Sequence, residues 1–117
     1  MINTTIRSIV VAVASGALAR LYACPKSIAA SHANRKQPAA IEDEIRAYEV
    51  ERTRIIGNAQ TLADDKRAAA VESDLSVLLA QPVELPGVPL ALADLLGGTL
   101  TETDWQALAD FLSPNEA

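Results

Sequence analysis

The chain has 117 residues, which is enough for one domain with a modest core, and half of them are hydrophobic, which excludes a disordered chain. Its net charge of −5 argues against nucleic-acid binding, because a polyanion is normally held by a basic surface. Only 3% of the residues are aromatic, so small aliphatic side chains must form a core that stays thin unless a partner covers part of it.

The charges are separated along the chain. Residues 1–41 carry five basic residues and no acidic one, whereas residues 42–117 carry fifteen acidic and five basic residues. The second part therefore has a net charge of −10. Such asymmetry predicts contact with a second charged surface, either another protein or an anionic membrane.

Residues 3–23 are expected to form an apolar helix that one of the polar residues at positions 3–5 caps. Apolar side chains occupy every face of this helix. Its uncharged stretch, Ser8–Ala19, has 12 residues, fewer than the roughly 20 that cross a bilayer. Three interpretations follow: a helix packed in the core or against a partner, a helix inserted in a membrane over residues 6–23, or a targeting segment. The basic, acid-free composition is typical of a mitochondrial presequence, whereas the matches to secretory and lipoprotein signals are poor.

A connector precedes the strongest helical pattern in the chain. Ser27 is suited to cap a short turn of helix within the connector, and Pro38 suits the first turn of the helix that follows. Over residues 39–81, apolar residues recur at spacings of three and four, which predicts helix. This apolar stripe changes phase beyond residues 64–67, and Gly57-Asn58 interrupts it, so we expect a bent long helix or a helical hairpin.

Residues 82–89 hold three prolines and a glycine, which predicts an extended turn. A short helix is expected over residues 90–97, ended by Gly97-Gly98. A last helix is expected from Asp104 to Leu112, with Thr101 or Thr103 as its cap and Thr103–Gln106 as a capping box, before Pro114 stops the chain. No β-strand is expected, because no segment shows sustained alternation.

Catalytic and metal-binding patterns are not found in the sequence. Cys24 and His32 are the single cysteine and histidine, and both lie in the connector, so a catalytic dyad or a structural zinc site is not expected. The lone cysteine also excludes an intramolecular disulfide. The acidic runs are expected to be solvated helix faces, and Trp105 to be either a core side chain or a partner-binding anchor.

The sequence thus predicts a small all-α protein without cofactor or metal. It divides the chain into residues 1–37 (basic apolar helix and connector), 38–81 (main helical segment) and 82–117 (proline-rich turn and short helices), the last packing with the second as one domain. The favoured function is a non-enzymatic interaction subunit of an oligomer or larger assembly, such as a virion, in the cytoplasm or within the assembled particle. A membrane-anchored protein and a small acidic inhibitor are the alternatives. The predicted partner-binding residues are Ile9, Val13, Leu21, Ile41, Ile45, Tyr48, Ile55, Leu62 and Trp105.

Overall fold

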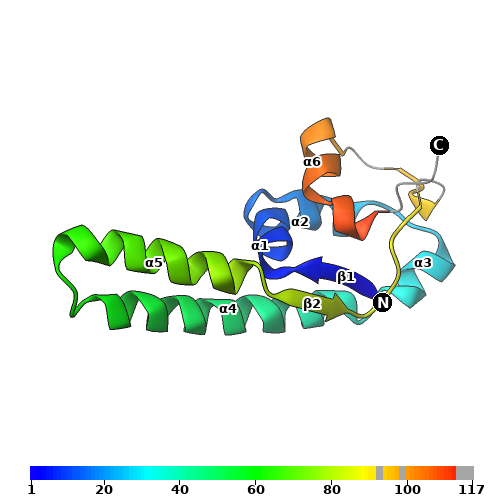
Figure 1. The fold of residues 1–117 in the computed structure, drawn as a ribbon. Helices are drawn as coiled ribbons and strands as arrows, with labels where there is room; N and C mark the ends of the chain where they lie inside the picture. The colour runs from blue at the N-terminus through cyan, green and yellow to red at the C-terminus, as the bar shows by residue number, and fades with distance from the viewer. Residues whose placement is uncertain (92–93, 98–99, 113–117) are drawn as a thin grey trace.

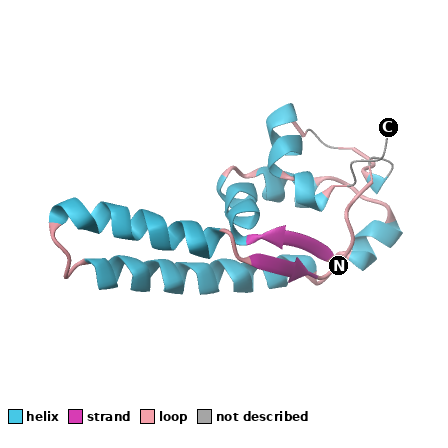
Figure 2. Ribbon diagram, viewed as in Figure 1, coloured by secondary structure: helices cyan, strands magenta, loops and turns pink. Residues whose placement is uncertain are grey.

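Helices dominate the computed structural model, which describes residues 1–91, 94–97 and 100–112 (Figures 1 and 2). In chain order the elements are β1 (Ile2–Thr5), α1 (Ile6–Ala14), α2 (Ala17–Ala23), α3 (Ile28–Ala33), α4 (Gln37–Ala59), α5 (Asp64–Leu79), β2 (Pro82–Leu85), α6 (Glu102–Ala107) and the 3-10 helix η2 (Ala109–Phe111). The predicted all-α class with a helical hairpin is confirmed, and a small sheet is added to it.

The two strands, β1 and β2, correct the expectation that the chain has no strand. They pair antiparallel, with Ile2 opposite Leu85 and Thr5 opposite Pro82. Ile2 and Leu85 are both fully buried, so this cross-strand pair belongs to the hydrophobic core. Each strand has only four residues, which is too short for alternation to show in the sequence, and burial of this pair explains why the segments are extended.

The prediction of a single N-terminal apolar helix over residues 3–23 is wrong. The segment forms two short helices, α1 and α2, that meet at 72°. Gly16 adopts φ +79° between them, a left-handed conformation that glycine tolerates best, and Arg20 Nη2 donates a hydrogen bond to the Ser15 carbonyl at 3.0 Å. Thr5 caps α1 by accepting a hydrogen bond from the Ser8 amide.

The main helical segment is a hairpin of α4 and α5 joined by residues 60–63. Gly57 and Asn58 remain helical, so the break follows them instead of falling on them. Pro38 lies in the first turn of α4, as the sequence predicts, because that turn does not need its missing amide hydrogen. The change of phase in the apolar stripe coincides with the start of α5 at Asp64.

Two of the residues predicted to cap helices, Ser27 and Thr101, do so. Ser27 caps α3 by accepting from the Ala30 amide at 3.2 Å. At α6 the capping box is formed by Thr101 and Asp104, each of which accepts a hydrogen bond from the other's amide. The helix therefore starts at Glu102, and the predicted box over Thr103–Gln106 is wrong.

The segment before α6 is described only in part. Leu90 forms a bridge with Leu112, and Leu95 forms one with Lys26, so both residues pair with distant backbone instead of continuing a helix. Residues 92 and 93 of the helix predicted over residues 90–97, Gly98 of its glycine stop, and Pro114 lie outside the described residues.

The core joins the two ends of the chain. Residues 1–37 and residues 82–112 supply most of its large buried side chains: Ile2, Ile9, Leu18, Leu21, Leu85, Leu90, Leu108, Phe111 and Leu112. The described part of residues 82–117 therefore packs mainly against the N-terminal segment, and β2 also contacts α4. The α4–α5 hairpin extends away from this body, and the molecule is 54 Å long (Figure 1).

Candidate functional site

The structure divides the nine sequence-predicted partner residues into three groups by exposure. Ile9, Leu21, Ile41 and Ile55 are buried against side chains of the same chain. Val13 and Leu62 are 41% and 38% exposed. The other three, Ile45, Tyr48 and Trp105, are half-buried, and Trp105 packs against the core from α6. The buried residues contribute mainly to the core of their own chain.

A mostly apolar groove of about 290 Å³ lies where α1 and α2 meet α4. We call it the body groove; it is lined by Val13, Leu18, Ala19, Tyr22, Pro38, Ile41, Glu42 and Ile45. Three of the predicted partner residues, Val13, Ile41 and Ile45, come together in it. Glu42 is its single charged side chain. The body groove can therefore receive apolar side chains, but it offers little polar chemistry to fix their orientation.

Hydrogen bonds hold the wall of the body groove in place. The Tyr22 hydroxyl donates to Gln37 Oε1 at 3.0 Å, and Gln37 Nε2 donates to the Pro86 carbonyl at 3.3 Å. Burial raises the pKa of Tyr22 well above its usual value, so the hydroxyl stays protonated and can keep donating. These bonds connect α2, α4 and the chain after β2.

A second, larger groove of about 710 Å³ runs along α5 on one side of the hairpin. We call it the hairpin groove; it is lined by Arg7, Ile56, Asp64, Arg67, Ala68, Val71, Glu72, Leu75, Ser76 and Leu79. No residue of α5 is buried, although the helix is 16 residues long. None of the nine predicted partner residues lies on α5. The spacing of Ala68, Val71 and Leu75 is the sequence signal for its apolar face.

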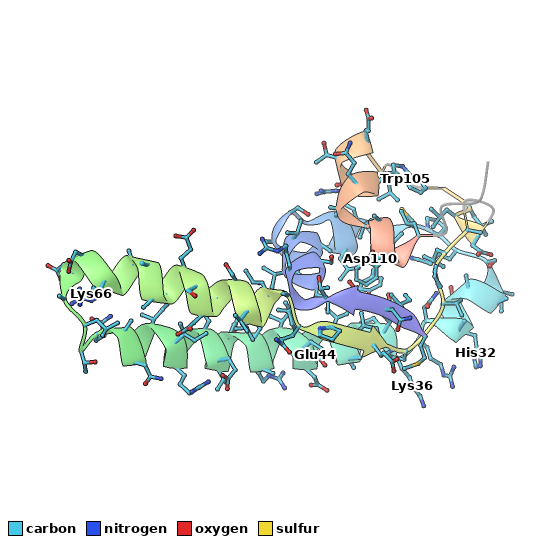
Figure 3. The ribbon with its side chains drawn as sticks, in the orientation of Figure 1. His32, Lys36, Glu44, Lys66, Trp105 and Asp110 are labelled. Carbon is cyan, nitrogen blue, oxygen red and sulfur yellow. The ribbon has the colours of Figure 1, made fainter. Side chains whose placement is uncertain are left out.

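Charged side chains mark the two ends of the hairpin groove. At the hairpin tip Arg67 Nη1 pairs with Asp64 Oδ1 at 3.0 Å, and its Nη2 donates to the Leu62 carbonyl at 3.2 Å. At the other end the Ile6 amide donates to the Gln81 carbonyl at 3.1 Å, which places the neighbouring Arg7 beside the C-terminal end of α5. Figure 3 shows the tip at Lys66, far from the body.

The opposite side of the hairpin is more polar. Its hollow is lined by Glu51, Arg54, Ile55, Asn58, Asp74, Val77, Leu78 and Gln81. Glu51 and Arg54 form an exposed ion pair, and its hydrogen bond raises the pKa of the Arg54 guanidinium. Exposed pairs of this kind contribute little to affinity, so this side is the weaker candidate for an interface.

The reactive side chains lie in different environments. Cys24 is buried, with its Sγ 3.2 Å from the Arg20 carbonyl. Lys26 Nζ donates to the Tyr22 and Cys24 carbonyls, and partial burial lowers its pKa. His32 is exposed on α3 (Figure 3). Within residues 1–91, 94–97 and 100–112, no group of three or more histidine, cysteine or acidic side chains is placed to hold a metal ion.

In the part of the chain that the structure describes, no single helix is long and apolar enough to cross a membrane. The bent pair of α1 and α2 reaches the required length and composition only when the two are taken together.

No protein-family model, curated protein or solved structure matches this chain.

Proposed function

We propose that this chain is a non-enzymatic interaction subunit that binds another protein chain through the hairpin groove. The observation that carries the proposal is α5: it has 16 residues, not one of them buried, and it holds an apolar face along an open groove. A contiguous apolar face of this kind is typical of a protein–protein interface.

Helix energetics support a bound partner. Most helical stability in proteins comes from packing an apolar face, and not from the intrinsic propensity of the helix. On its own chain α5 packs mainly against α4, which leaves Val71, Leu75 and Leu79 half-exposed. Covering these side chains would contribute roughly 25 cal/mol for each Å² of apolar surface removed from water.

The alternatives receive less support. A membrane anchor over residues 6–23 would have to withdraw Ile9, Leu18 and Leu21 from the core, where they are almost completely buried. An inhibitor that imitates a polyanion needs unpaired acidic groups on one face. The hairpin groove, however, carries Arg7 and Arg67 beside Asp64 and Glu72, so acidic groups do not dominate it.

Site-specific photo-crosslinking in cells that produce the protein tests the proposal. A photoreactive residue replaces Ala68, which is exposed in the hairpin groove, or Val50, which is exposed on α4 outside all three hollows, as the matched control. We expect a discrete crosslinked protein from position 68 and none from position 50. The proposal fails if neither position yields a product, or if both yield the same one.

A further inference from the structure

We infer that the protein bound in the hairpin groove is a second copy of this chain, with the two α5 helices lying antiparallel across a two-fold axis. This inference rests on the function proposed above and specifies its partner. Two features of the groove carry it: the opposite charges at its ends and the graded size of the side chains between them.

The charges favour the antiparallel arrangement. Asp64 begins α5 at the hairpin tip, and Arg7 lies beside the other end of α5, about 22 Å away at 1.5 Å per residue. A two-fold axis through the middle of α5 brings Arg7 of each copy to Asp64 of the other, so the same attractive contact forms twice. A parallel arrangement would instead place Arg7 against Arg7 and Asp64 against Asp64, and like charges across an interface oppose association. The exposed Glu72 lies near its own copy in both arrangements, so its charge does not distinguish them.

Both charged groups are free to make this contact. Asp64 has a side chain 94% exposed, and its ion pair with Arg67 engages Oδ1, which leaves Oδ2 open to a second cation. Arg7 is exposed, and no ion pair to it occurs among the residues that the structure describes. The pair therefore forms without breaking an existing ion pair.

The side chains between the charged ends increase in size along α5, and this gradient is compatible with the same two-fold axis. The midpoint of α5 lies between Val71 and Glu72, and Ala68 and Leu75 lie equally far on either side of it. The two-fold axis thus sets the small Ala68 of one copy against the large Leu75 of the other. Alternation of small and large side chains across facing positions is what close helix packing requires.

A charge-swap experiment on the full chain tests the inference. We expect the wild type to dimerise in sedimentation velocity at low salt, and Arg7→Glu and Asp64→Lys each to weaken dimerisation about tenfold or more, because two attractive contacts become repulsive. Mixed in equal amounts, the two variants should form a heterodimer, since both contacts between positions 7 and 64 are attractive again. Because each variant serves as the folding control for the other, recovery on mixing cannot arise from a folding defect.

Disulfide trapping tests the direction of the helices independently, in a Cys24→Ser background. Glu72→Cys lies next to the two-fold axis and should crosslink to itself, whereas Asp64→Cys should not, because a disulfide needs Cα atoms within about 7 Å. Equal crosslinking of both variants would indicate parallel helices and overturn the inference, as would a mixture of charge variants that stays monomeric. A monomeric wild type also overturns it. The proposed function would still stand if position 68 crosslinks to a foreign protein, and would fall only if that experiment fails too.

Discussion

Arg20 holds the buried carboxylate of Asp104 from the other end of the chain. Its Nε donates to Asp104 Oδ2 at 2.8 Å, and its Nη2 donates to Oδ1. Asp104 is 1% exposed and also closes the capping box of α6 with Thr101. One carboxylate therefore joins α2 to α6 and fixes the start of α6.

This pair predicts a loss of stability in acid. The hydrogen bond from Arg20 lowers the pKa of Asp104 to about 2, against about 3.9 in an unfolded chain. Because the folded-state pKa is depressed, the stabilisation is complete above about pH 4 and is lost as the pH falls toward 2. Thermal unfolding followed between pH 5 and pH 2 should show this decline in the wild type. The decline should be smaller in Asp104→Asn, and the exposed Asp43→Asn should behave as the wild type does.

The sequence could reveal the hairpin but not this pair. Helical spacing over residues 39–81 repeats many times within a short stretch, so the two helices and a change of phase could be predicted from it. The Arg20–Asp104 contact joins residues 84 positions apart, and no local pattern records such a contact. The same is true of β1 and β2, whose four-residue segments become strands only because Ile2 and Leu85 meet in the core.

The error at the N-terminal helix has a local cause. The apolar composition of residues 3–23 indicated helix correctly but could not fix its direction. Gly16 turns the chain by 72°, and this turn buries both α1 and α2 in one core. Ile9 and Leu21, two of the predicted partner residues, are therefore buried in the core of their own chain.

Replacement by alanine should have opposite effects on the stability of the fold at Gly87 and at Gly57. Gly87 has φ +102°, and a Cβ built there would lie 2.0 Å from Asn34 Oδ1, so Gly87→Ala should destabilise the fold by about 1–3 kcal/mol. Gly57 lies within α4 with open space around it, and Gly57→Ala should stabilise the fold by about 0.5–1 kcal/mol. Urea denaturation of both variants measures the difference. Equal effects would mean that the chain around Gly87 is arranged differently.

The two isoleucines on α4 should differ in their tolerance of charge. Ile55 is buried between α4 and α5, so Ile55→Asp should cost on the order of 3 kcal/mol or more. Ile45 is half-buried at the body groove, where an aspartate can reach water, so Ile45→Asp should cost clearly less. Glu51→Ala removes one exposed ion pair and should be nearly silent. Thermal unfolding would contradict this order if Ile45→Asp proved the more damaging change.

Cys24 should report on unfolding without taking part in function. Its thiol is buried at the end of α2, so a thiol reagent should react only as the chain unfolds. Cys24→Ser keeps a donor within reach of the Arg20 carbonyl and should fold and associate normally. His32→Ala removes an exposed side chain and should also be silent. Loss of a specific activity in either variant, with the fold intact, would overturn the non-enzymatic proposal.

The core also predicts that residues 38–117 do not fold alone. Removing residues 1–37 deletes β1, α1, α2 and α3, together with Ile2, Ile9, Leu18 and Leu21 from the core. Leu85, Leu108 and Phe111 would lose their packing partners, and β2 would lose its only paired strand among the described residues. We expect this fragment to keep some helical circular dichroism from the hairpin but to unfold without a cooperative thermal transition. A sharp transition close to that of the whole chain would mean that residues 1–37 are a separable segment, as the charge pattern alone suggests, and not half of the core.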